Sequence, residues 1–153
     1  MGTVRLYADH NATSPIRPAA LAAVTAALAE VGNPSSIHAE GRAARARIEA
    51  ARIAVAGLVA GAPANVVFTS GASEAAATAL TPALGFEKLI VFAGEHPCVA
   101  AGGRFPADAV SVAPSDALGR IDLDALSAML DGPAVLALQA ANNETGVIQP
   151  VAE

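Results

Sequence analysis

The stretch VVFTSGASEA, residues 66–75, predicts a strand, a tight turn and the start of a helix. Residues 66–69 are apolar and rich in β-branched side chains, as in a buried strand. Ser70 and Gly71 interrupt that pattern, and good helix formers follow over residues 74–80. This change of pattern indicates a strand–turn–helix unit, which is the building block of parallel sheets.

The turn in this stretch has the chemistry of an anion site. Gly71 has no Cβ, so a ligand can approach the backbone there. The first N–H groups of a helix lack intrahelical partners and carry the positive end of the helix dipole. Together with the Ser73 hydroxyl they favour an anion, most naturally a phosphate. The alternative is an ordinary helix start capped by Ser70 or Ser73.

Helix and strand patterns alternate along most of the chain. Apolar residues at helical spacing predict helices at residues 18–30, 38–60 and 123–130. Apolar runs predict strands at residues 88–93, 109–113 and 134–140, and a short strand or extended arm at 4–8. Continuous apolar strands separated by helices are typical of a parallel sheet covered on both faces. We therefore expect an α/β fold, with an arm and helices in residues 1–60 and an α/β domain in residues 61–153.

In such sheets ligands bind outside the carboxyl ends of the strands. Polar, turn-prone segments follow three of the predicted strands: SGAS at 70–73, GEHP at 94–97 and ANNETG at 141–146. We expect these three strand ends to converge on one site.

Composition excludes several classes of function. The 153 residues carry a net charge of −5, and we interpret Arg42, Arg45, Arg47 and Arg52 as the solvated face of a helix, so no nucleic-acid partner is expected. The single cysteine, Cys98, excludes an internal disulfide and fits a reducing compartment. The N-terminus has no signal-peptide pattern, and no apolar run reaches the ~18 residues of a membrane span. We expect an acidic cytoplasmic protein without membrane or metal sites.

Five motifs in order resemble a known family. They are DHNATSP at 9–15, GNPSSIH at 32–38, FTSGASE at 68–74, EH at 95–96 and NNETG at 142–146. Together they resemble the N-terminal part of a cysteine desulfurase of the NifS/IscS type, a class V aminotransferase relative. Five motifs in register are far more specific than any one of them. The resemblance implies a mainly parallel sheet flanked by helices, with residues 61–153 as the first part of an incomplete large domain of fold-type I PLP-dependent transferases.

The resemblance also implies the cofactor pyridoxal 5′-phosphate (PLP) and assigns residues to it. Ala72 and Ser73 bind its phosphate, His96 stacks on its pyridine ring as the catalytic residue of this part, and Asn143 reaches its phenolic oxygen. The residue types suit these roles, because histidine moves protons near neutral pH and an amide can donate to a phenolate. Without the resemblance, we would interpret His96 as a surface or capping residue and Asn143 as a turn residue.

The implied reaction takes sulfur from L-cysteine. It releases L-alanine and leaves a persulfide on an enzyme cysteine, whose sulfur passes to an acceptor protein for iron–sulfur cluster or thio-cofactor assembly. The complete enzyme is implied to be a homodimer.

The chain departs from the family pattern because it ends at Glu153. The family's Schiff-base lysine, pyridinium aspartate and sulfur-accepting cysteine all lie further on. The only lysine, Lys88, lacks the family's preceding histidine, and we interpret Cys98 as a half-buried structural thiol. Ala77 replaces a common asparagine, which weakens the support at the phosphate end. We expect the chain to be inactive and poorly stable on its own.

Three alternatives remain open at this point. Another PLP lyase of the same fold, such as a selenocysteine lyase, shares these motifs. A truncated paralogue could serve as a non-catalytic partner. A nucleotide-phosphate binder is the least favoured, because neither GxxxxGK nor GxGxxG occurs in the chain.

Overall fold

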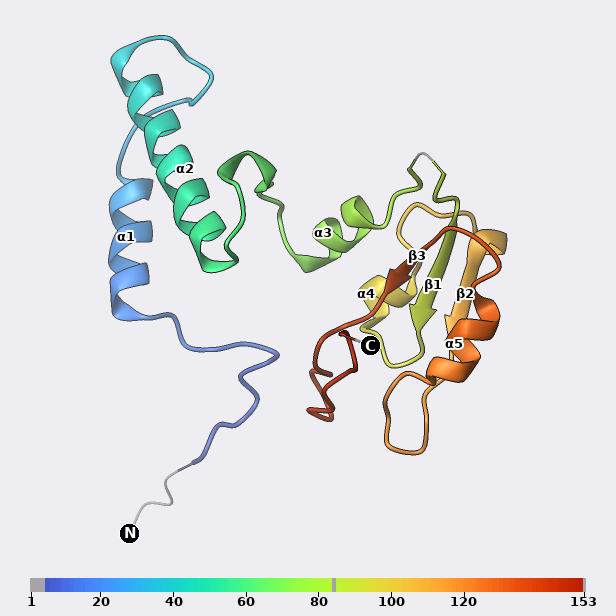
Figure 1. Cartoon of the computed structure of the whole chain (residues 1–153). Helices are drawn as coiled ribbons and strands as arrows, with labels where there is room; N and C mark the ends of the chain where they lie inside the picture. Colours follow the sequence, from blue (N-terminus) through green and yellow to red (C-terminus); the bar gives the residue numbers. More distant parts are fainter. Residues whose placement is uncertain (1–4, 84, 153) are drawn as a thin grey trace. The chain divides into compact units, whose positions relative to one another are not determined.

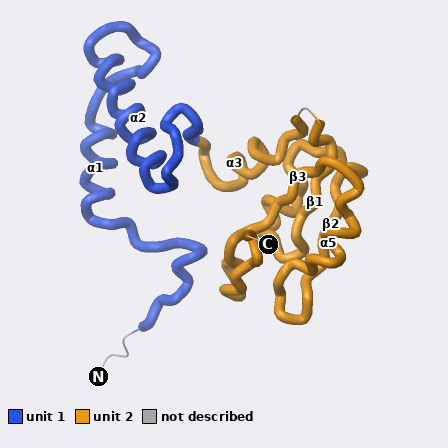
Figure 2. The backbone as a smooth tube through the Cα atoms, viewed as in Figure 1, with its two compact units in different colours: residues 1–68 blue, residues 69–153 orange. Residues whose placement is uncertain are grey.

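The computed structural model describes residues 5–83 and 85–152. By their internal contacts the residues form two compact units, residues 1–68 and residues 69–153 (Figure 2). Within the described residues, no helix combines the length and the apolar character that crossing a membrane requires.

The first unit consists of two helices and a short turn (Figure 1). Helix α1 spans Pro18–Leu28, with proline in its first turn as the sequence predicts, and α2 spans Ala39–Leu58. A 3₁₀ turn, Pro63–Asn65, packs against α2. Among the described residues of this unit only Gly41 and Ala56 are buried. The unit therefore has almost no hydrophobic core of its own.

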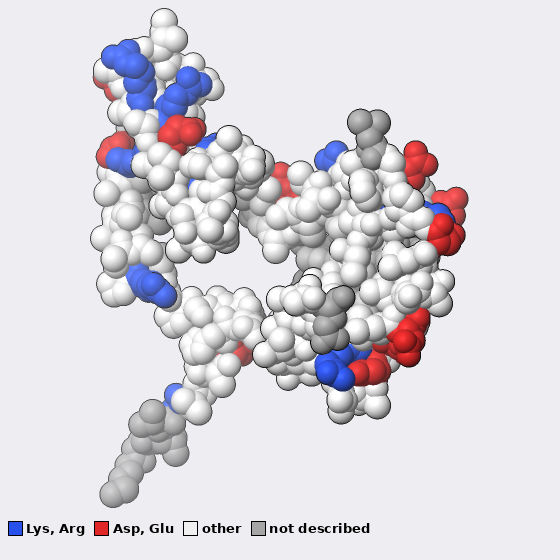
Figure 3. Space-filling model, viewed as in Figure 1, with Lys and Arg blue, Asp and Glu red and all other residues white. Residues whose placement is uncertain are grey.

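Of the four arginines of α2, Arg42, Arg45 and Arg47 are exposed as predicted, whereas Arg52 is half-buried. Figure 3 shows basic side chains grouped on this part of the molecule. Arg47 lies 2.5 Å from the Glu30 carboxylate, and Arg52 lies 3.4 Å from that of Glu49. Such surface pairs contribute at most about 1 kcal/mol each.

The predicted strand at residues 66–69 is wrong. The backbone is extended at Val66, with φ −85° and ψ 122°, but within the described residues this segment has no sheet partner. Val67 remains 71% exposed. The Arg52 guanidinium donates to the Val66 carbonyl and lies 5.2 Å from the centre of the Phe68 ring. A β-branched run favours an extended chain, but only backbone pairing makes it a strand.

The arm predicted at residues 4–8 begins outside the described residues. Its described part, residues 5–8, has no regular secondary structure.

The second unit is built on a three-stranded parallel sheet. Its strands are β1 (Lys88–Phe92), β2 (Val110–Ala113) and β3 (Ala134–Ala137), in the order β2-β1-β3. Leu89 aligns with Val110 on one side and with Val135 on the other. The parallel α/β architecture that the sequence predicts is thereby confirmed.

Helices cover both faces of this sheet, as predicted. They are α4 (Pro97–Ala100) and α5 (Leu123–Met129), whereas α3 (Ala72–Ala79) packs against α4. Leu89 and Val91 enter one apolar cluster, with Leu80 after α3 and Val99 of α4. The alternate residues Ile90 and Phe92 enter a second cluster, which includes Leu126 and Met129 of α5. Strand β1 is therefore buried on both faces, and the core of the unit surrounds it.

Candidate functional site

The candidate site lies at the carboxyl edge of the sheet. Strand β1 leads into residues 94–96, and the parallel strand β3 leads into residues 139–143. Because the two strands are parallel neighbours, their following loops emerge at the same edge, where ligands of open α/β sheets bind.

Hydrogen bonds join these two loops directly. The Gly94 carbonyl accepts from Gln139 Nε2 at 2.5 Å and from Asn142 Nδ2 at 2.9 Å. The Glu95 carboxylate accepts from the Gln139 backbone N–H. We call these four residues the loop junction. The sequence predicts that these two loops converge but does not predict the hydrogen bonds between them, whose partners lie 44 to 48 positions apart.

His96 caps helix α4 and is exposed. Its Nδ1 accepts from the Cys98 N–H at 3.2 Å and lies 3.0 Å from Cys98 Sγ. A ring that accepts at Nδ1 carries its proton, when neutral, on Nε2. Cys98 is a half-buried free thiol. The capping role thus uses one edge of the imidazole and is compatible with a ligand against its face.

Asn143 lies at the tip of an exposed turn that its neighbour shapes. Asn142 Oδ1 accepts from the N–H groups of Glu144 at 2.9 Å and Thr145 at 2.8 Å. Asn143 Nδ2 donates to Glu144 Oε1 at 3.0 Å. The turn-forming role therefore belongs to Asn142, and the amide of Asn143 lies at the surface.

Ala72 and Ser73 stand at the exposed head of α3. Among the described residues, no side chain accepts a hydrogen bond from the first-turn N–H groups of this helix. A Cβ added at Gly71 would meet nothing within 4 Å, so this side of the turn is open. Open N–H groups at a helix head fit an anion.

Neither Ser70 nor Ser73 acts as the helix cap. Instead, the Glu74 carboxylate accepts from the Ser70 hydroxyl at 2.7 Å and from the Ser70 N–H at 2.6 Å. These two donors, the hydroxyl first, lower the pKa of Glu74 below its ordinary value.

The structure brings together the loops of two of the four predicted site residues, His96 and Asn143. The loops of His96 and Asn143 are hydrogen-bonded through the loop junction. Ala72 and Ser73 belong to a helix that packs against α4, which begins directly after His96 (Figure 1). The buried end of α3 is Leu80, whose carbonyl accepts from the Arg104 N–H, whereas Ala72 and Ser73 at the other end of the helix are exposed.

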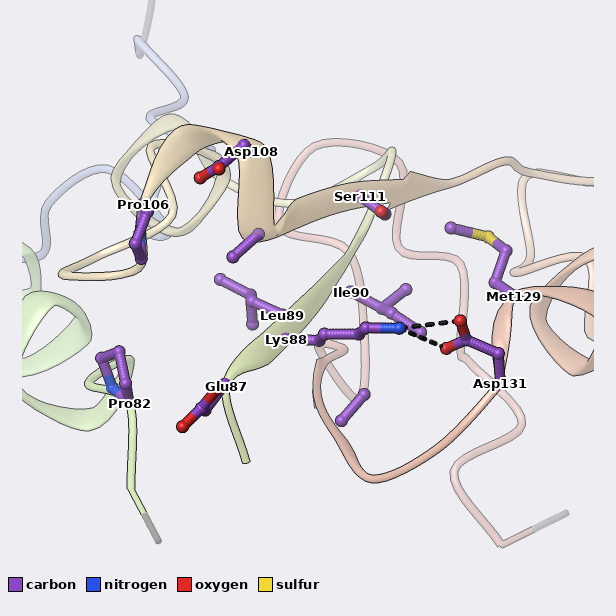
Figure 4. Close-up of a pocket in the computed structure, with 12 residues that line it drawn as sticks. Pro82, Glu87, Lys88, Leu89, Ile90, Pro106, Asp108, Ser111, Met129 and Asp131 are labelled. Atoms are coloured by element: carbon purple, nitrogen blue, oxygen red, sulfur yellow. Dashed lines mark hydrogen bonds and ion pairs between the residues drawn. The ribbon is translucent and has the colours of Figure 1, made fainter. Parts of the chain in front are cut away.

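A separate cavity of about 720 Å³ lies at the amino edge of the sheet (Figure 4). Lys88, at the start of β1, points across it to Asp131, with Nζ at 2.6 and 2.7 Å from the two carboxylate oxygens. The hydrogen bond and the charge of Lys88 lower the pKa of Asp131. The only lysine of the chain is therefore engaged at the edge opposite to His96.

In the part of the chain that the structure describes, no group of three or more His, Cys, Asp or Glu side chains could hold a metal ion.

Comparisons with known proteins agree with this fold. The family model for class-V aminotransferases matches residues 6–153. A cysteine desulfurase of Cereibacter sphaeroides is 40% identical over 158 residues, which cover 96% of this chain and 41% of that protein. A selenocysteine lyase of Xenopus tropicalis is 35% identical, covering 97% of this chain and 40% of that protein.

Among solved structures, a NifS-like protein from Rickettsia africae is similar, with a TM-score of 0.81 and 26% identity. The match covers 94% of this chain and 42% of that one. The chain thus spans about two fifths of the length of the relatives that it matches.

Proposed function

The chain belongs to the class-V aminotransferase family, and from this we propose that it is the N-terminal portion of a PLP-dependent cysteine desulfurase. The whole enzyme would convert L-cysteine to L-alanine and hold the sulfur as a persulfide on a cysteine. That sulfur would pass to an acceptor protein in iron–sulfur cluster or thio-cofactor assembly. Similarity to cysteine desulfurases at about two fifths identity supports this choice within the family.

In this proposal four residues of the second unit hold the cofactor. The N–H groups of Ala72 and Ser73, with the Ser73 hydroxyl, bind the phosphate. The open side of Gly71 and the uncapped head of α3 within the described residues fit that group. His96 stacks on the pyridine ring, and its Nε2 is the atom that can hold or release a proton. Asn143 donates to the phenolic oxygen.

PLP, when bound, supplies an electron sink that weakens the bonds at the substrate's Cα. The chain's own residues orient the ring and neutralise its phosphate through helix N–H groups. The observation that carries the proposal is the loop junction, because it ties the loops of His96 and Asn143 together at the edge where parallel sheets bind ligands.

We further propose that the 153-residue chain alone does not desulfurate cysteine, and that the active enzyme is a cytoplasmic homodimer. Lys88 is paired with Asp131 at the opposite edge of the sheet, so no lysine of this chain is offered to the cofactor. Sulfide release from L-cysteine by the purified chain with PLP would contradict the first statement.

The decisive experiment is a titration of the chain with PLP, followed by the absorbance of the cofactor. Ser73→Ala should weaken binding of PLP but not of pyridoxal, which lacks the phosphate. His96→Ala should weaken binding of both and change the absorbance of the bound ring. The controls are Ser127→Ala, an exposed helix serine, and His38→Ala, a histidine that also caps a helix through Nδ1. Unchanged affinity and spectrum in His96→Ala would refute the stacking role.

A selenocysteine lyase is the second candidate, because relatives of that name match the chain at 35% identity. A comparison of L-cysteine with L-selenocysteine as substrate of the whole enzyme would distinguish the two.

A further inference from the structure

We infer that Asn142 is a positioning residue of the cofactor site. It shapes the turn that carries Asn143 and holds that turn against the loop that carries His96. The inference rests on the proposed function, because the two side chains that it positions are the ones assigned there to the PLP ring.

The half-buried Asn142 side chain uses both ends of its amide. Its Oδ1 accepts from the N–H groups of Glu144 and Thr145, at 2.9 and 2.8 Å. Its Nδ2 donates to the Gly94 carbonyl at 2.9 Å. One small side chain therefore makes two bonds inside the turn and one bond to another loop.

The backbone of Asn142 is fixed as well. Its N–H donates to the Val147 carbonyl and its carbonyl accepts from the Gly146 N–H, both at 2.9 Å. Gly146 has φ +73°, a conformation that glycine adopts without strain. These two backbone hydrogen bonds close the turn between residues 142 and 147. Asn143 lies inside this turn, so the bonds also restrict its position.

The bond to Gly94 has a predicted site residue close to each of its ends. Asn143 follows Asn142 directly, and His96 lies two residues after Gly94. The two bonded residues are 48 positions apart in the sequence. Gln139 Nε2 also donates to the Gly94 carbonyl, so the loops stay in contact without Asn142. Loss of the Asn142 side chain would remove the hydrogen bond that attaches the turn of Asn143 to the Gly94 carbonyl.

The amide suits this set of bonds, because its oxygen accepts and its NH₂ group donates. An ionised aspartate would still accept from Glu144 and Thr145 but has no proton for the Gly94 carbonyl. Alanine would lose all three bonds without adding a charge. Asn142→Asp therefore keeps the bonds that shape the turn and loses the bond to Gly94, whereas Asn142→Ala loses both kinds. An effect that both variants share does not come from the added charge of the aspartate.

A matched control exists in the same unit. Asp116 Oδ1 accepts from the N–H groups of Leu118 at 2.8 Å and Arg120 at 2.9 Å, in a neighbouring turn whose Gly119 carbonyl accepts from Gln149 Nε2. Asp116→Ala removes a comparable number of turn bonds. It should lower stability in a similar way and leave the affinity for PLP unchanged.

The experiment measures each variant with and without PLP. Both Asn142 variants should bind PLP about fivefold more weakly, the effect of one lost hydrogen bond, and the absorbance maximum of the bound cofactor should shift. Without PLP, the backbone NMR signals of Glu95 and His96 should move in both variants. Amide exchange at Glu144 and Thr145 should stay slow in Asn142→Asp and become faster in Asn142→Ala.

The outcomes distinguish this inference from the proposed function. If wild type binds PLP and both Asn142 variants bind it equally well, the inference is wrong and the proposed function stands. If the unliganded spectra change only within residues 140–147, the inference is wrong as well. If wild type does not bind PLP but the signals of Glu95 and His96 move, the proposed function is wrong and the coupling of the two loops stands.

Discussion

Gly71 stands at the turn into α3 with φ 169° and ψ 179°, an extended backbone that any residue can adopt. A Cβ at this position would meet nothing within 4 Å. The backbone conformation therefore does not require glycine at this position. The absence of a side chain matters because it leaves the N–H groups of Ala72 and Ser73 accessible to a ligand.

Gly71→Ala should accordingly separate binding from stability. We expect the free energy of unfolding to change by less than about 0.5 kcal/mol, while PLP binds more weakly because the new methyl group restricts the approach of its phosphate. Urea unfolding and absorbance titration measure the two effects. Gly132→Ala is the control, since a Cβ there also meets open space. Equal affinity in both variants would argue against a phosphate at this turn.

The Lys88–Asp131 pair should give the stability of the chain an acid dependence. The pKa of Asp131 is lowered in the folded state by the hydrogen bond and charge of Lys88. Its contribution is therefore present above the ordinary value of 3.8 and is lost as the pH falls through the lower folded value. The difference in the free energy of unfolding between wild type and Asp131→Asn should decrease to zero as the pH falls through that range. High salt should also reduce it.

Asp108→Asn, which changes another carboxylate of the same cavity, serves as the comparison for that titration. A difference between wild type and Asp131→Asn that persists at the most acidic pH would show that the pair is not its source.

Among the elements, β1 carries most of the packing, because it lies between β2 and β3 and under helices on both faces. Val91 of β1 is 2% exposed, whereas Val112, its aligned partner on the edge strand β2, is 62% exposed. The two valines are neighbours in one sheet and differ chiefly in burial.

Val91→Ala should lower the free energy of unfolding by about 2 kcal/mol, the cost of two buried methyl groups and the space they leave. Val112→Ala should lower it by less than about 0.5 kcal/mol, because water already reaches that side chain. Chemical denaturation of both variants tests this. Similar losses would mean that β2 is covered in solution.

The sequence predicts the helices and strands whose own residues show a clear apolar run or helical spacing. The apolar runs at β1, β2 and β3 and the helical spacing at α1, α2 and α5 each give a local signal. Residues 66–69 give the same signal, but a strand needs a partner that the run itself cannot specify. Helix α4 gives no such signal, because four residues are too few to show a helical period.

The same distinction applies to the candidate site. The motifs around Ser73, His96 and Asn143 point to positions after strands, and the structure places the last two on hydrogen-bonded loops. The roles of Glu95, Gln139 and Asn142 could not be inferred, because each depends on a contact between residues more than 40 positions apart.

At the scale of the whole molecule, the two units differ in how they are stabilised. The second unit has two apolar clusters around β1, whereas the first exposes large apolar side chains such as Leu28 at 81% and Leu58 at 85%. Helices without buried faces depend on their marginal intrinsic stability.

Hydrogen exchange should show this difference directly. We expect amides of β1 to exchange slowly, through opening of the whole second unit, and those of α1 and α2 to exchange rapidly, through local unfolding. Mass spectrometry of exchanged and digested chain can resolve these segments. Equal protection of α2 and β1 would mean that the apolar faces of the first unit are covered in solution.

The position of Lys88 has a practical consequence. Its amine is the only side-chain amine of the chain and stands at the start of a strand whose other end leads toward His96. Five residues of strand separate the two edges by roughly 16 Å. Coupling the chain to a solid support through Lys88 would therefore leave the loops at the opposite edge facing the solvent and accessible to added small molecules.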